Sequence, residues 1–258
     1  FKLRKGVKFH TTRYFTPSRE LNADDVIFSF NRQMDKENPF YLVGGGIYEY
    51  FQSMEMEKLI NSVEKLDAQT IKINLSKPNA AFLANLAMPF MSVLSLEYAE
   101  KLIKEKNKDE IDHSPIGTGP FIFVNYAKDN LIRFKANPLY FEGAPKIKQL
   151  VFSITPDANV RYQKLKTGEC HFIIEPSPSD LPNMKTDKKI TVMEGPGLNI
   201  AYLALNTSKA PFDNLNVRLA INHALNKDAY IKAIYLGNAI AAKNPIPPTI
   251  WSYNEKIK

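Results

Sequence analysis

The sequence contains one cysteine, one tryptophan and four histidines among its 258 residues. The histidines are His10, His113, His171 and His223, and no two of them stand at the spacing of a metal-binding motif. No apolar run approaches the ~20 residues that a membrane-spanning helix requires. A nucleophile elbow, an HExxH motif and a phosphate-loop lysine are also missing. These absences argue against a metal site, against a membrane span and against the common hydrolases.

The composition, with 44% hydrophobic and 24% charged residues, is typical of a globular protein. The net charge of +7 could indicate a nucleic-acid partner, but the lysines are dispersed and no basic run is interleaved with stacking aromatics. Cys170 and His171 are neighbours on a predicted strand, so their side chains would point to opposite faces and could not form a catalytic pair. We therefore predict no nucleic-acid binding, no enzymatic activity, no metal and no resident cofactor.

The most distinctive stretch is SPIGTGPFIF, residues 114–123, in which Gly117 and Gly119 bracket a threonine. A glycine pair can cradle a phosphate, but a phosphate loop leads into a helix whose N-terminal amides face the anion. Here Pro120 and an apolar run follow, which is typical of a strand. The pattern predicts a tight turn before a strand, where glycine supplies backbone angles that other residues avoid.

Hydrophobic periodicity and turn residues predict a mixed α/β (α+β) fold. Helices are expected over 22–34, 54–63, 78–91, 97–108, 157–165 and 214–234, with a short one within 177–185. Strands are expected over 1–10, 70–75, 121–126, 131–135, 150–154, 170–174, 190–194 and 200–205. The strand, helix and strand over 150–174 are the one parallel-sheet signal, while 121–135 reads as a hairpin.

Asp24 and Asp25 are adjacent carboxylates that could suggest a catalytic or metal-binding pair. Neighbouring residues on a helix point about 100° apart, so the two side chains could not easily share a substrate. Asn22 precedes them at the predicted start of a helix, where carboxylates oppose the positive end of the helix dipole. Helix capping is therefore the expected role of both aspartates.

The run Gly44-Gly45-Gly46 is followed by Tyr48 and Tyr50. Three glycines cost conformational entropy, so a position that carries them is either a flexible loop or a backbone that something approaches closely. In the second case the glycines and an aromatic side chain would form the wall of a ligand site. The residues alone leave both interpretations open.

Six blocks of the sequence together resemble a known family. They are FKLRKGVKFH (1–10), ELNADDVIFSFNRQ (20–33), GGGIYEYF (44–51), PIGTGPF (115–121), LVFSITPDANVRYQKLKTGEC (150–170) and APFDNLNVRLAINHALNKDAYI (210–231). In this order they resemble the large periplasmic peptide-binding proteins of ABC importers, solute-binding protein family 5. The resemblance runs along essentially the whole chain and is strongest to the dipeptide-binding branch, which includes proteins described as haem- or glutathione-binding.

This resemblance implies a type II periplasmic binding protein fold with an extra accessory lobe, incomplete in this chain. Residues 1–115 would belong to the accessory α+β lobe, 116–189 to part of the first ligand-binding lobe, and 190–258 to the start of the second. In the family the opening block lies well inside the chain, and a long lobe follows the point where this sequence stops. We therefore expect an internal piece of a larger protein.

The resemblance also assigns roles to individual residues. Tyr48 matches a tyrosine that lines the peptide cleft of dipeptide binders, which implies that Gly45, Gly46 and Tyr48 contact the ligand, whereas Tyr50 is expected to pack inward. Cys170 matches a position that forms a disulfide with a cysteine near the mature N-terminus, outside this chain. From the residues alone, Cys170 could equally be a buried free thiol.

The function implied by the resemblance is capture of a short peptide, a dipeptide or glutathione, by hinge closure, with delivery to an inner-membrane ABC permease. The family's main charged ligand contacts lie outside this piece. The protein would be a monomer in the periplasm of a Gram-negative bacterium, with or without a lipid anchor. The alternatives are haem as the ligand of the same fold, a hydrolytic enzyme, or a folding fragment whose cleft is incomplete.

Overall fold

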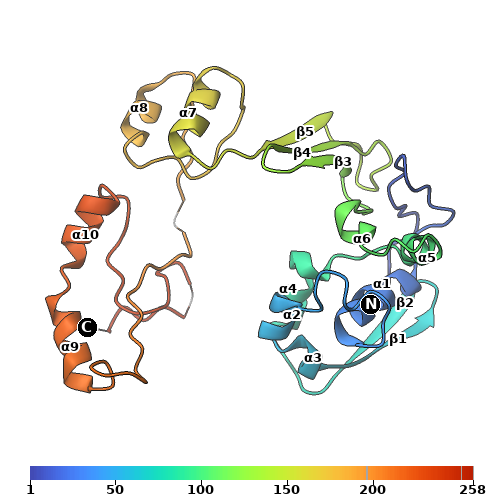
Figure 1. Cartoon of the computed structure of the whole chain (residues 1–258), viewed down its shortest axis with the longest axis horizontal. Coiled ribbons are helices and arrows are strands. Elements are labelled where there is room, and N and C mark those ends of the chain that lie inside the picture. Colours follow the sequence, from blue (N-terminus) through green and yellow to red (C-terminus); the bar gives the residue numbers. More distant parts are fainter. Residues whose placement is uncertain (196, 251, 258) are drawn as a thin grey trace. The chain divides into compact units, whose positions relative to one another are not determined.

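The computed structural model describes residues 1–195, 197–250 and 252–257 (Figure 1). The chain divides into two compact units, an N-terminal unit of Phe1–Ile154 and a C-terminal unit of Thr155–Lys258. Both contain helices, and the strands of the described residues, β1 to β5, lie in the N-terminal unit, in agreement with the mixed α/β prediction. None of the helices among the described residues is both long enough and apolar enough to span a bilayer.

Helix α1, Ala23–Met34, begins where the sequence predicts. The Asn22 side chain accepts from the backbone N–H of Asp24 at 2.9 Å, and the Asp25 carboxylate accepts from the N–H of Asn22 at 2.9 Å. This reciprocal pairing is a capping box, which satisfies N–H groups that have no partner within the helix. The predicted capping role is confirmed for Asn22 and Asp25, whereas Asp24 lies in the first turn and its carboxylate pairs with Lys65 at 2.8 Å.

After α1 the chain forms two short helices and a hairpin. Helix α2 is Glu49–Ser53 and α3 is Met56–Leu59, and β1, Ile60–Asp67, pairs antiparallel with β2, Thr70–Leu75. The strand predicted over 70–75 is confirmed. The helix predicted over 54–63 is wrong beyond Leu59, because the hairpin ladder with β2 overrides the helical spacing of the apolar residues from Ile60 onward.

Two further predictions for the N-terminal unit need correction. The first ten residues make only isolated bridges, Lys2 with Thr70 and Lys8 with Glu20, although Val7 and Phe9 are buried as the alternation predicts. The helix expected over 78–91 is interrupted, giving α4, Phe82–Leu86, and a 3₁₀ turn, Pro89–Met91. Pro89 lacks the N–H that would continue the α-helical bonds.

Helices α5, Leu96–Lys104, and α6, Glu110–His113, complete the helical part of this unit. Its interior consists of two hydrophobic clusters. The first is built around Phe15, Phe28, Phe40 and Tyr98, and the second, beneath the β1–β2 hairpin, around Phe51, Met56, Ile71 and Phe82. The edge-on contact of Phe28 and Phe40, with centroids 5.6 Å apart, is typical of a well-packed aromatic core.

A three-stranded antiparallel sheet follows, with the order β3, β4, β5. Strand β3 is Phe121–Ala127, β4 is Leu131–Ala136 and β5 is Gln149–Ser153. The predicted hairpin is confirmed, and Asp129 has φ +58° at its turn. The predicted parallel strand–helix–strand unit is wrong, because β5 pairs antiparallel with β4 and residues 170–174 form no strand.

The C-terminal unit is helical in its regular elements. They are α7, Ala158–Lys166, α8, Leu181–Thr186, α9, Leu215–Ala224, and α10, Lys227–Ile234. The N-cap predicted at Asp157 is confirmed, but the strands predicted over 190–194 and 200–205 are absent from the described residues there. The long helix predicted over 214–234 is broken at Leu225, because Asn226 caps a new helix.

Candidate ligand-binding site

The glycine run has a backbone conformation that other residues rarely adopt. Gly44, Gly45 and Gly46 have φ of +81°, +94° and +67°, in the left-handed region that glycine occupies without strain. A Cβ on Gly46 would lie 3.0 Å from Cδ2 of Leu42 and 3.3 Å from Cε1 of Tyr41. Gly45 has open space on that side and is exposed. The run therefore presents a bare, accessible backbone whose conformation requires glycine.

The side chain of Tyr48 packs against the residues that precede the glycine run. It is half-buried, and its hydroxyl donates to the carbonyl oxygen of Tyr41 at 3.0 Å and lies 3.3 Å from that of Phe40. The rings of Tyr41 and Tyr48 pack at a tilt, with centroids 5.6 Å apart. Burial raises the pKa of the Tyr48 phenol, and the nearby Arg32 guanidinium opposes that shift. The hydroxyl thus acts within the loop, and the ring is the part of Tyr48 left for a ligand.

An ion pair between Arg32 and Asp112 lies next to Gly44. The Arg32 guanidinium donates through Nη2 to both carboxylate oxygens of Asp112, at 2.7 and 2.8 Å. Arg32 is 7% exposed, and a Cβ on Gly44 would lie 3.4 Å from Oδ2 of Asp112. The sequence analysis missed this pair because its members are 80 residues apart in the chain. No local signal marked the pair, because Arg32 lies on the side of the predicted helix opposite Val26 and Phe30.

Large apolar side chains are exposed beside the glycine run. Leu42 and Ile47 are each 74% exposed. Tyr50 is 60% exposed and stacks on Phe90, with centroids 6.3 Å apart, so the expectation that Tyr50 packs inward is wrong. An exposed backbone flanked by accessible aliphatic and aromatic side chains can bind a ligand that has both amide groups and apolar side chains.

The glycine-containing stretch at the centre of the chain is a bend that leads into a strand, at the predicted place. The reason predicted for its glycines is wrong, because neither Gly117 nor Gly119 is among the residues with positive φ. The chain bends at Gly119 and Pro120 and enters β3 at Phe121. The carbonyl oxygen of Gly119 lies 2.9 Å from Nε2 of His10 and 3.0 Å from Nδ2 of Asn137. No helix begins here, so this stretch does not form a phosphate loop.

Cys170 lies in the C-terminal unit, just beyond α7. It is half-buried, and its backbone N–H donates to the carbonyl oxygen of Lys164 at 3.0 Å. The thiol is free in this structure. Within the described residues no three histidine, cysteine or acidic side chains gather closely enough to hold a metal ion.

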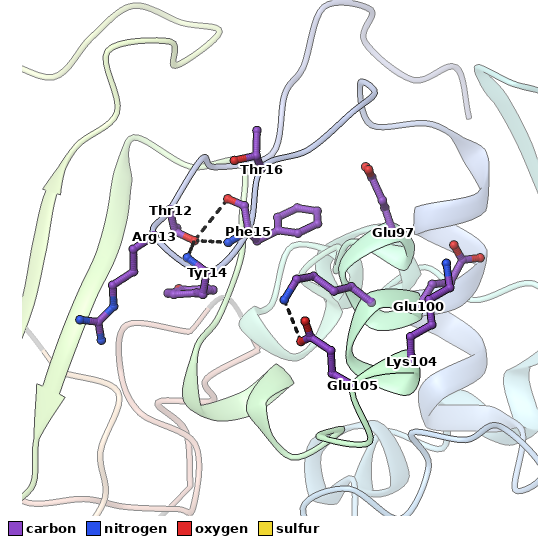
Figure 2. A pocket seen from close by; sticks show the side chains of 10 residues that line it. Thr12, Arg13, Tyr14, Phe15, Thr16, Glu97, Glu100, Lys104 and Glu105 are labelled. Atoms are coloured by element: carbon purple, nitrogen blue, oxygen red, sulfur yellow. Dashed lines mark hydrogen bonds and ion pairs between the residues drawn. The ribbon is translucent and has the colours of Figure 1, made fainter.

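A separate groove lies between residues 12–16 and helix α5 (Figure 2). Its volume is about 560 Å³. The Thr12 hydroxyl organises one wall by accepting from the N–H groups of Tyr14 and Phe15. The other wall carries both signs of charge, including the Lys101–Glu105 ion pair at 2.7 Å. The groove shares no lining residue with the glycine run, and its mixed charges define no single class of ligand.

Comparison with known proteins identifies the class to which this chain belongs. The model of the bacterial extracellular solute-binding proteins, family 5 (middle), matches residues 1–258. The chain is therefore a member of that family, as the sequence blocks indicated.

Particular relatives are similar along the whole chain. Heme-binding protein A of Haemophilus influenzae and the dipeptide-binding protein of Escherichia coli are each 52% identical over 258 residues, covering 100% of this chain and 47% and 48% of the relatives. The solved structure of the ABC transporter-associated periplasmic binding protein DppA from Helicobacter pylori, in complex with the peptide STSA, has a TM-score of 0.94 and 44% identity. It is matched over 100% of this chain and 50% of its own. The chain thus spans about half the length of these relatives and has their type II binding-protein fold, incomplete here.

Proposed function

We propose that this chain is the middle part of the substrate-binding component of an ABC importer, which captures short peptides in the periplasm and delivers them to an inner-membrane permease. The observation that carries the proposal is the exposed left-handed glycine run backed by Tyr48. It occurs in a chain 52% identical to a dipeptide-binding protein. The protein would act as a monomer, without enzymatic activity, nucleic-acid partner or resident cofactor.

In this proposal residues 1–115 form the accessory lobe, 116–189 part of the first ligand lobe and 190–258 the start of the second. Hinge closure would bury the ligand, and contacts made only in the closed form would supply the difference in affinity that drives closure. Gly45 and Gly46 would allow close approach of the ligand, while the ring of Tyr48 supplies an aromatic wall. The apolar side chains of Leu42 and Ile47 favour a ligand with apolar substituents.

Haem is the second candidate ligand. The observations in its favour are the 52% identity to a protein named for haem binding and the exposed apolar surface around the glycine run. An aromatic wall suits either a peptide backbone or a porphyrin. Dipeptides are preferred because a bare glycine backbone favours a slender ligand with amide groups. Glutathione fits the same description as a peptide-like ligand.

The test is titration calorimetry of the protein, expressed with its native flanking sequence, against a dipeptide panel, glutathione and haemin. We expect dipeptides or glutathione to bind, and Tyr48→Ala to weaken that binding by about 1–2 kcal/mol through loss of the aromatic contact and its buried apolar area. Tyr48→Phe keeps the ring and is the matched control, with a smaller loss. Binding of haemin alone would replace the peptide proposal, and unchanged affinity in a folded Tyr48→Ala variant would remove Tyr48 from the site.

We also propose that Cys170 forms a disulfide with a cysteine outside this chain, in keeping with an oxidising periplasm. The prediction is that a thiol-specific reagent does not label Cys170 in the oxidised, denatured protein with its native flanking sequence, and labels it fully after reduction. A Cys170→Ser variant identifies the labelled residue by its loss of signal. Stoichiometric labelling of Cys170 without reduction would contradict the disulfide.

A further inference from the structure

The carbonyl oxygen of Gly119 is the meeting point of two buried polar side chains. His10 and Asn137 are each 5% exposed, and both reach this one oxygen, His10 through Nε2 at 2.9 Å and Asn137 through Nδ2 at 3.0 Å. The three residues come from the opening segment, the central bend and the segment after β4. Buried polar groups that share one acceptor restrict the local conformation strongly, because each loses its partner if the others move.

Backbone hydrogen bonds also connect these three segments, and we call their meeting point at Gly119 the joint. The N–H of His10 donates to the carbonyl oxygen of Gly117 at 2.9 Å, and the N–H of Asn137 donates to that of Pro120 at 2.8 Å. The Tyr14 hydroxyl donates to the carbonyl oxygen of Pro115 at 3.1 Å. The bend is thereby tied on one side to the segment that carries Val7 and Phe9 into the first hydrophobic cluster, and on the other to the end of β4.

The geometry determines the state of the imidazole. A carbonyl oxygen can only accept, so Nε2 of His10 carries a proton, and in the neutral ring Nδ1 is then the unprotonated nitrogen. The other face of the ring meets Gly117, where an added Cβ would lie 3.6 Å from Cε1 and 3.9 Å from Nδ1. A second proton would place an uncompensated positive charge in a buried site.

We propose that His10 is a positioning residue that locks the central bend between the helical part of the N-terminal unit and its β3–β5 sheet, and that protonation of its ring loosens this joint. Because protonation of His10 depends on pH, the geometry of the joint would change in mild acid, to which a protein in contact with the extracellular medium is exposed. It depends on contacts within the N-terminal unit and not on the identity of the ligand.

The surrounding charges do not offset the cost of protonation. The charged or titratable residues nearest in the chain to His10, the bend and Asn137 are Lys8, Arg13, Asp112, His113 and Lys135. Among the residues that the structure describes, none of these charges shifts the pKa of His10, which burial lowers below 6.5 and the Gly119 hydrogen bond partly restores. A depressed pKa in the folded state means that the unfolded state binds more protons below pH 6.5, so the stabilisation is complete above that pH and is lost as the pH falls.

The test is hydrogen exchange of the His10 and Asn137 amides in the protein with its native flanking sequence, corrected for intrinsic rates. Between about pH 7.5 and about pH 5 we expect their protection to fall, because the folded joint binds fewer protons in this range than the opened form does. His10→Gln retains a side-chain N–H donor but does not titrate, so this pH-dependent loss should be absent. His113→Gln, at an exposed histidine of the same unit, should behave as the unmodified protein.

An equal loss of protection in the unmodified protein and in His10→Gln would overturn the proposal. If His10→Gln does not fold, the nitrogen resonances of the unmodified imidazole provide the second measurement. A neutral ring protonated at Nε2 and resistant to acid supports the joint, whereas a ring protonated at Nδ1, or one that titrates as an exposed histidine, contradicts it.

Discussion

Asp25→Ala is expected to lower the free energy of unfolding of the N-terminal unit by about 3–5 kcal/mol, because it removes a fully buried carboxylate and leaves its hydrogen-bond donors without an acceptor. The Asp25 side chain is fully buried and accepts from both terminal nitrogens of Arg19, at 2.6 and 2.9 Å. It also accepts from the backbone N–H groups of Asn22 and Leu96, each at 2.9 Å. One carboxylate thus joins the cap of α1 to the first residue of α5.

The measurement is urea unfolding, and Asp24→Ala is the matched control. Asp24 is the neighbouring carboxylate, but its side chain is 38% exposed and its partner is the equally accessible Lys65, at 2.8 Å. A surface pair of this kind contributes about 1 kcal/mol or less. Equal destabilisation by the two substitutions would show that the charge near the helix start, and not the buried network of Asp25, is what matters.

Arg161→Met is expected to destabilise the C-terminal unit locally by about 2–4 kcal/mol, the scale of losing several charge-assisted hydrogen bonds that are not additive. Nη1 of Arg161 donates to the carbonyl oxygens of Thr155 and Pro156, at 2.9 and 2.6 Å, and Nη2 donates to that of Glu175 at 2.8 Å. This one guanidinium therefore joins the start of the unit to the loop that follows Cys170.

The loss would appear as faster hydrogen exchange along α7. Arg161→Lys keeps the charge but not the planar fork, so it should recover only a minor part of the stability. Lys188→Met removes an exposed positive charge from the same unit and should leave exchange along α7 unchanged. Full recovery by lysine would mean that charge alone, without the geometry of the fork, holds these carbonyls.

The structure separates what local sequence specifies from what tertiary pairing decides. The start of α1 was predictable, because Asn22 and the two aspartates form a signal within four residues. Strand β1 was not, because its ladder with β2 overrides an apolar spacing that fits a helix. The strands expected over 190–194 and 200–205 rested on local patterns, and a strand also needs a neighbour to complete its hydrogen bonds.

The same distinction applies to the candidate site. The glycine run and Tyr48 could be found because they are contiguous and lie in a recognisable block. The Arg32–Asp112 pair beneath Gly44 and the meeting of His10 with Asn137 at Gly119 join segments distant in sequence. Periodicity and spacing within one segment contain no information about such pairings.

The two units differ in what holds them together, and this difference governs how each responds to cooling. Of the described large apolar side chains that are buried, Tyr162 and Met184 belong to the C-terminal unit and the others to the N-terminal unit. The heat-capacity change of unfolding arises from exposing apolar surface, so the N-terminal unit contributes the larger share of it. That unit loses hydrophobic stabilisation in the cold. The hydrogen bonds of Arg161 involve little apolar burial, so the stabilisation that they provide depends much less on temperature.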